Sequence, residues 1–174
     1  MKTDVAIIGG GAVGLCAALM AARQNLRVVL VEAHEPKTWQ RAAPDLRVVA
    51  LALDNQAMLE GLGVWQKLQT MHVRAYSAMQ VFDEIESAPL CFHAGDSGRD
   101  CLGHILENTA LTEALWQAVV AEKNITLYCP DKLESLHNDP DSVHIVLRSG
   151  IEVQARLAIG ADGAASKVRQ LLTI

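Results

Sequence analysis

A glycine-rich apolar stretch at residues 4–22, DVAIIGGGAVGLCAALMAA, constrains the fold more than any other feature of the sequence. After Asp4 it runs for eighteen residues without a charge, long enough for a membrane-spanning helix or for the apolar part of a secretory signal. Glycines at positions 9, 10, 11 and 14 interrupt it, and each weakens a helix by about 1 kcal/mol relative to alanine. The β-branched run before the glycines and the helical run after them instead predict a strand, a turn and a helix.

The spacing of these glycines favours a turn that holds a phosphate. Gly9, Gly11 and Gly14 form G-x-G-x-x-G directly after a strand. The first glycine permits the tight turn, the second lets a pyrophosphate approach the backbone, and the third lets the helix pack close to the strand. A second apolar strand follows at 26–32 and ends in Glu32, whose carboxylate can accept hydrogen bonds from a ribose diol. The pattern predicts dinucleotide binding and leaves the dinucleotide open.

Composition excludes several classes of function. The chain has 174 residues, of which 51% are hydrophobic, so we expect an ordered domain with a core. Its net charge of −5, interspersed bases and 4% aromatic residues disfavour nucleic-acid binding. The four cysteines are irregularly spaced without C-x-x-C, which favours reduced thiols in a cytoplasmic protein. The six histidines show no paired ligand spacing, so the sequence predicts no metal site.

The order of the remaining elements indicates the fold class. We expect a helix from Leu53 with Asp54 as its N-cap, and a second helix over 108–124. Short strands from residue 125 onward predict a small antiparallel meander, followed by a last buried strand at 157–161. The sequence therefore predicts an α/β fold, in which a Rossmann-like βαβ unit and a parallel sheet carry a small antiparallel β-meander insertion.

A second candidate site follows that last strand, in LAIGADGAASKVR at 157–169. Asp162 and Gly163 stand at the carboxyl end of a strand, where open α/β sheets bind ligands. The Asp162 carboxylate can cap the following helix or accept a hydrogen bond from a ligand hydroxyl. Both interpretations stay open from the sequence.

Four segments together carry a family resemblance: GGGAVGL with Glu32, DLRVVAL, LGHILENTALTEALWQ and IGADGAASKVR. They resemble the flavin-dependent aromatic hydroxylases of the p-hydroxybenzoate hydroxylase class. GVWQ at 63–66 and the pattern at 102–116 resemble the ubiquinone-biosynthesis hydroxylases, which act on polyprenyl-phenol rings. The likeness spans nearly all of this chain but only the N-terminal part of such an enzyme.

The resemblance implies that the dinucleotide is FAD, with NAD(P)H as a transient reductant. It implies these FAD-binding residues: Gly9, Gly11, Ala12, Val13 and Gly14 at the pyrophosphate, Glu32 at the adenosine ribose, Arg47 at the phosphates, Asn108 near the flavin chain, and Asp162 with Gly163 in the family's D-G motif. A helix-capping role is the alternative for Asn108. Ala52 and Ala165 depart from the family pattern, which commonly has Ser and Asn there.

The implied reaction is hydroxylation of an aromatic ring of a polyprenyl-phenol with NAD(P)H and O2. Because the flavin carries that chemistry, we expect no catalytic residue in this chain, although His104 and Glu107 lie in a family segment. Another FAD-dependent oxidoreductase of the same fold and a non-catalytic dinucleotide-binding fragment remain alternatives.

The resemblance also bears on the organisation of the whole protein. We expect residues 1–174 to be the FAD-binding domain of a longer flavoprotein, inactive alone, because the family's second FAD motif and substrate domain are absent from this sequence. The longer protein is expected to take a lipid-like phenolic substrate and no nucleic acid. Peripheral association with the inner membrane, a multi-enzyme complex and a homo-oligomer are further expectations.

Overall fold

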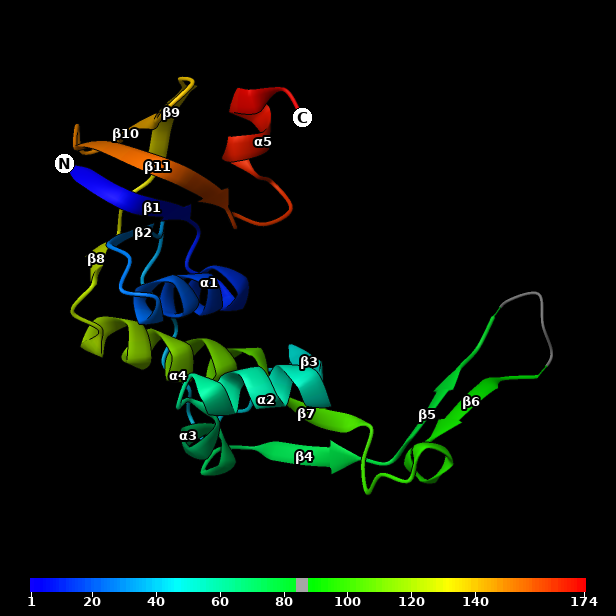
Figure 1. The fold of residues 1–174 in the computed structure, drawn as a ribbon. Helices are drawn as coiled ribbons and strands as arrows, with labels where there is room; N and C mark the ends of the chain where they lie inside the picture. The colour runs from blue at the N-terminus through cyan, green and yellow to red at the C-terminus, as the bar shows by residue number, and fades with distance from the viewer. Residues whose placement is uncertain (84–87) are drawn as a thin grey trace. The chain divides into compact units, whose positions relative to one another are not determined.

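The computed structural model describes residues 1–83 and 88–174, and these form two compact units (Figure 1). The first unit comprises Met1–Lys37 and Thr112–Ile174, and the second comprises Thr38–Leu111. The elements in chain order are β1 Lys2–Ile8, α1 Ala12–Arg23, β2 Val28–Val31, β3 Val48–Ala52, α2 Leu53–Gly61, α3 Trp65–Gln69, β4 Val73–Tyr76, β5 Ala78–Val81, β6 Leu90–His93, the 3-10 helix η1 Ala94–Ser97, β7 Gly103–Glu107, α4 Asn108–Ala121, β8 Ile125–Tyr128, β9 Leu133–Asn138, β10 Val143–Leu147, β11 Glu152–Gly160 and α5 Lys167–Leu172.

The first unit is built on a six-stranded sheet in the order β8-β2-β1-β11-β10-β9. The first four strands of that order are parallel, whereas β10 pairs antiparallel with both β11 and β9. The glycine-rich stretch forms β1, a turn and α1, as the sequence predicts. A mostly parallel sheet with an antiparallel part confirms the predicted α/β fold class.

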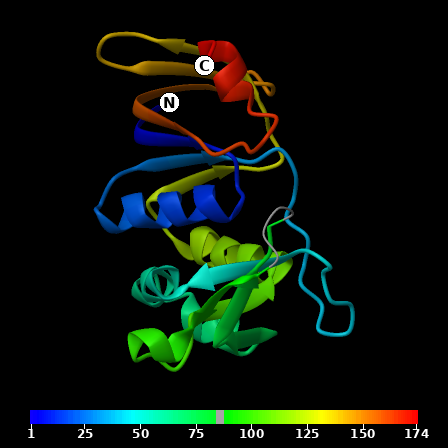
Figure 2. The same cartoon turned by 90° about the vertical axis from the view of Figure 1, so that its right-hand side faces the viewer.

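Apolar side chains cover both faces of this sheet. All four residues of β2, VVLV, are buried, as expected for a parallel strand covered on both sides. Helix α1 buries Leu15, Ala18 and Leu19, while Val168 of α5 joins a separate cluster with residues of the strands. Figure 2 shows α1 and α5 on opposite faces of the sheet. The two helices therefore pack against different clusters of buried side chains.

The chain's last strand differs from the prediction. β11 is one nine-residue strand, which pairs antiparallel with β10 and parallel with β1. Its buried residues include Val153 and Ala155, whereas Leu157 is 54% exposed, so the predicted separate buried strand at 157–161 is wrong. The cause is pairing: β10 reaches only residues 152–155 of β11. Among residues 1–83 and 88–174, no other strand borders the rest of β11 on that side.

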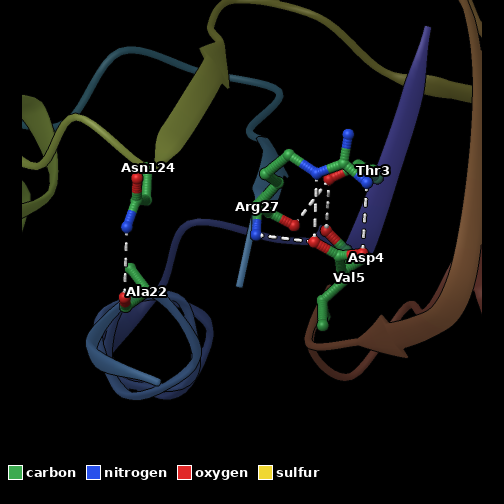
Figure 3. Close-up of polar contacts among 6 residues, drawn as sticks. All are labelled: Thr3, Asp4, Val5, Ala22, Arg27 and Asn124. Carbon is green, nitrogen blue, oxygen red and sulfur yellow. Dashed lines mark hydrogen bonds and ion pairs between the residues drawn. The ribbon is translucent and has the colours of Figure 1, made fainter. Parts of the chain in front are cut away.

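Polar contacts fasten the start of β1 to the turn between α1 and β2 (Figure 3). The Thr3 hydroxyl donates to the Arg27 carbonyl at 2.7 Å, and the Asp4 carboxylate accepts from the Arg27 backbone N–H at 2.9 Å and from its Nε at 3.1 Å. The Asn124 side-chain amide donates to the Ala22 carbonyl at 3.4 Å, which joins the end of α1 to the residue before β8. These contacts help set the register in which the carboxyl ends of β1 and β2 lie side by side.

The second unit contains the antiparallel sheet β3-β7-β4 and the hairpin β5-β6. Helix α2 begins at Leu53 as predicted, but its N-cap is Ala52 and Asp54 lies in its first turn. The predicted cap is wrong because β3 runs into the helix without a linker, so the cap falls on the last residue of the strand. Asp54 still complements the helix dipole there.

The helix predicted at 108–124 is α4, Asn108–Ala121, which begins where the sequence indicated. In the described residues, none of the helices combines the length and the apolarity that crossing a membrane requires.

Candidate functional site

The carboxyl ends of β1, β2 and β11 open onto one pocket of about 640 Å³ in the first unit. The chain leaves β1 toward β2 on one side, while β11 lies on the other, so the pocket occupies the switch point of the parallel sheet. Five of the predicted residues line it: Gly9, Gly11, Glu32, Asp162 and Gly163.

Two of the glycines in the turn are required by close packing. Gly9 has φ +112°, and a Cβ there would lie 2.3 Å from the Ala161 carbonyl oxygen. A Cβ on Gly14 would lie 1.8 Å from the Gly9 carbonyl oxygen. These two glycines therefore let β1, α1 and the segment after β11 approach one another.

Gly11 has a different environment. A Cβ built on it would meet no atom of the described residues within 4 Å, although the residue lines the pocket. Its φ of −73° is accessible to any residue. Gly11 thus leaves open space at the pocket wall, where a ligand can approach the backbone.

The N-terminus of α1 offers unneutralised backbone donors beside that space. Gly11 is the N-cap and has no side chain to accept from them, and the first turn holds no acid. Free N–H groups and the helix dipole favour an anion at this position. The predicted residues Ala12 and Val13 lie in this first turn, and Val13 is 75% exposed. Neither of them is among the described residues that line the pocket.

Glu32 directly follows β2 and is held against the glycine turn. Its Oε2 accepts from the Gly10 backbone N–H at 2.5 Å, and its Oε1 accepts from the His34 N–H at 2.9 Å. A Cβ on Gly10 would lie 2.9 Å from the Cβ of Glu32, so the middle glycine makes this contact possible. Since each carboxylate oxygen keeps acceptor capacity, Glu32 can also accept from two ligand hydroxyls. This role of Gly10 was not predicted from the sequence.

Asp162 lies at the opposite wall of the pocket and accepts hydrogen bonds from the start of α5, whose N-cap is Ser166. Its Oδ1 accepts from the Ser166 hydroxyl at 2.6 Å, and its Oδ2 accepts from the backbone N–H groups of Lys167 at 2.6 Å and Val168 at 3.1 Å. Burial alone raises the pKa of the Asp162 carboxyl, but these hydrogen bonds lower it more, so the pKa lies below its usual value. The capping interpretation therefore describes the structure, and the fixed carboxylate also lines the pocket.

Arg47 and Asn108, the two predicted residues of the second unit, are neighbours there. The Asn108 backbone N–H donates to the Arg47 carbonyl at 2.9 Å. The Arg47 N–H in turn donates to Asp45 Oδ1 at 3.0 Å. Both residues flank paired strands, since Arg47 precedes β3 and Asn108 follows β7.

Glu107 is a buried carboxylate for which the sequence predicts no role. It is 4% exposed and accepts from the Trp39 indole N–H at 3.1 Å and the Asp45 backbone N–H at 2.6 Å, while His72 Nδ1 lies 2.8 Å from its Oε1. Burial raises the pKa of Glu107, yet the hydrogen bonds from Asp45, Trp39 and His72 lower it more, so the pKa lies below its usual value. The signal in the sequence was an acid ending an apolar strand immediately before a helix.

The residues of the pocket fit a dinucleotide such as FAD. The open wall at Gly11 and the free N–H groups of α1 suit a diphosphate, and the remaining acceptor positions of Glu32 suit a ribose diol. The diphosphate and the ribose, the two most polar parts of such a ligand, would thus both lie in this one crevice.

Comparisons with known proteins agree with this chemistry. The chain is 39% identical over 173 residues to 3-demethoxyubiquinol 3-hydroxylase of Escherichia coli (strain K12), and the matched region covers 99% of this chain and 44% of that protein. It is 33% identical to ubiquinone hydroxylase UbiL of Rhodospirillum rubrum, covering 96% of this chain and 38% of that protein. The chain therefore spans less than half the length of these relatives.

Solved structures show the same fold. The crystal structure of p-nitrophenol 4-monooxygenase PnpA from Pseudomonas putida DLL-E4 superposes with a TM-score of 0.77 at 19% identity, over 98% of this chain and 44% of that one. The sequence model of the FAD binding domain family matches residues 2–174. This match covers almost the whole sequence, and the chain therefore belongs to the FAD-binding domain family.

Proposed function

We propose that residues 1–174 are the FAD-binding domain of a longer flavin monooxygenase that hydroxylates the ring of a polyprenyl-phenol in ubiquinone biosynthesis. The observation that carries this proposal is the likeness, over 99% of the chain, to 3-demethoxyubiquinol 3-hydroxylase. The pocket adds a physical reason, because its glycine turn and fixed carboxylate suit the two polar parts of FAD.

The following residue roles belong to the proposal. Backbone N–H groups from Gly11 through Ala12, Val13 and Gly14 hold the diphosphate, for which Gly9 shapes the turn, and Glu32 accepts from the adenosine ribose. Arg47 adds a positive charge at the phosphates, Asn108 lies near the flavin chain, and Asp162 with Gly163 completes the wall.

FAD bound here would supply the redox chemistry of a hydroxylation that consumes NAD(P)H and O2. The residues of this chain would bind and orient the cofactor. Asp162 stays ionised at neutral pH, since its hydrogen bonds keep its pKa low, and so presents only acceptor oxygens to a ligand.

The substrate and surroundings of the whole protein follow from its chemistry. A polyprenyl-phenol is a lipid, so we expect the complete protein to work at the cytoplasmic face of the inner membrane, in contact with other enzymes or with its own copies. A different FAD-dependent hydroxylase is the alternative, because structures such as p-nitrophenol 4-monooxygenase share this fold and act on other rings.

The test uses the protein expressed from its complete gene. We expect a yellow protein with the absorption spectrum of FAD, which oxidises NADH or NADPH faster when a short-chain prenyl phenol is present. Mass spectrometry should show a product with one added oxygen atom. A protein that lacks flavin after purification and cannot take it up would refute FAD binding. A flavoprotein that hydroxylates only phenols without a prenyl chain would support the alternative.

A further inference from the structure

One buried carboxylate, that of Glu107, contributes to the order of the loop that precedes β3. Residues 38–47 form neither helix nor strand, and such a segment loses about 1–2 kcal/mol of conformational entropy per ordered residue. Glu107 contacts this loop at two points six residues apart, through the Trp39 indole N–H and the Asp45 backbone N–H. A single side chain thus closes the loop onto the end of β7.

Arg47 stands at the end of this loop, within two hydrogen bonds of Glu107. Asp45 donates its N–H to Glu107 and accepts the N–H of Arg47 on Oδ1. On the other side, Asn108, the next residue after Glu107, donates its N–H to the Arg47 carbonyl. The backbone of Arg47 is therefore held from both directions, and both contacts lead back to residues 107–108.

The other partners of Glu107 keep its charge in place. His72 Nδ1 lies 2.8 Å from Oε1, and its ring packs edge-on against Trp39 with centroids 5.3 Å apart. Arg41 lies over the Trp39 ring, 5.8 Å from its centroid, and donates to the Thr70 carbonyl at 2.8 Å. An unpaired carboxylate at 4% exposure would be costly, whereas this one has a donor for each oxygen.

We propose that Glu107 is a positioning residue: it orders residues 39–47 and with them the backbone of Arg47, the residue that the proposed function assigns to the FAD diphosphate. The inference rests on the proposed role of Arg47. Glu107 does not touch FAD in this proposal. It lowers the cost of binding because the loop is ordered before the cofactor arrives.

The experiment measures the dissociation constant of FAD from the apoprotein of the complete gene product. Four forms make a double-mutant cycle: the unchanged protein, Arg47→Ala, Glu107→Gln and the double variant. We expect each single variant to weaken FAD binding by about tenfold. The double variant should match Arg47→Ala within about twofold, because Glu107 acts through Arg47. Trypsin should also cleave the apoprotein faster after Arg41 in Glu107→Gln.

Asp4→Asn is the matched control, since Asp4 is a carboxylate with backbone and side-chain donors from Arg27 but lies outside the proposed site. It should leave the FAD dissociation constant within about twofold. Trp39→Phe removes one donor to Glu107 and keeps its charge, so it replaces Glu107→Gln in the cycle if that variant does not fold.

The outcomes separate the two proposals. If Arg47→Ala binds FAD as tightly as the unchanged protein, the role of Arg47 in the proposed function fails, and this inference fails with it. If Arg47→Ala weakens binding but Glu107→Gln does not, only the inference fails. If both single variants raise the FAD dissociation constant and the two factors multiply in the double variant, the inference is also overturned, because Glu107 then acts independently of Arg47.

Discussion

Replacing Gly14 with alanine should reduce the stability of the fold, whereas replacing Gly11 with alanine should weaken ligand binding and leave the stability nearly unchanged. A methyl on Gly14 would lie 1.8 Å from the Gly9 carbonyl oxygen, whereas ordinary contact begins at 3.4 Å, so the methyl is about 1.6 Å too close. The obstructing atom is backbone, so α1 must move away from β1. Overpacking of this kind costs about 3 kcal/mol of unfolding free energy, and FAD binding should be lost with the turn geometry.

Gly11→Ala should behave in the opposite way. Its Cβ meets none of the described atoms within 4 Å, and its φ of −73° suits alanine, so the unfolding free energy should fall by less than about 1 kcal/mol. The methyl would occupy the space through which a diphosphate approaches the backbone, and FAD should bind at least about tenfold more weakly.

Urea denaturation and fluorescence titration with FAD measure the two effects on each variant. A Gly11→Ala protein that binds FAD within about twofold of the unchanged protein would refute the assignment of this wall to the diphosphate. A Gly14→Ala protein as stable as the unchanged one would refute the packing argument.

Three further predictions concern single side chains. Glu32→Gln should weaken FAD binding by about tenfold in fluorescence titration, since an amide NH2 cannot accept from a ribose hydroxyl; unchanged affinity would contradict the role of Glu32. Asp162→Asn should cost about 1 kcal/mol in urea denaturation at pH 7, because an amide oxygen accepts hydrogen bonds more weakly than a carboxylate oxygen. Burial raises the pKa of Asp162, but hydrogen bonds, including that from Ser166, lower it below its usual value, so this difference should shrink as the pH falls from the unfolded pKa of about 4 through the folded pKa. Equal differences at both ends of that range would argue against an ionised cap. Burial raises the pKa of the Cys16 thiol to about 11, so a brief maleimide pulse at pH 8, read by mass spectrometry, should label the exposed Cys91 first. Rapid labelling of Cys16 would show that α1 opens readily.

Local patterns were sufficient for the first βαβ unit. Gly9 and Gly14 were predicted from spacing alone, because tight turns and close helix packing require the absence of a side chain wherever they occur. The position of Glu32 at the end of β2 was equally predictable, since a strand's carboxyl end points toward the ligand edge of a parallel sheet.

Contacts between distant segments were not predictable in this way. The middle glycine, Gly10, receives its role from a carboxylate 22 residues later, and Glu107 receives its role from Trp39, 68 residues earlier. No local period encodes such pairs, so the partners of Glu107 could not be predicted from the sequence. The division of β11 between β10 and β1 was missed for the same reason, because pairing on its two edges depends on strands far apart in the chain.

The sequence by itself determined the strand, the glycine turn and the helix, because steric limits on φ and ψ and the periodicity of apolar residues act over a few neighbours. It also determined the family, through segments that each lie within a short stretch. Only the tertiary structure decided which carboxylates are held and by what, since Glu32, Asp162 and Glu107 are fixed by donors that folding brings to them. Hydrogen bonds need partners within about 3 Å, and only the folded chain brings residues far apart in sequence to that distance.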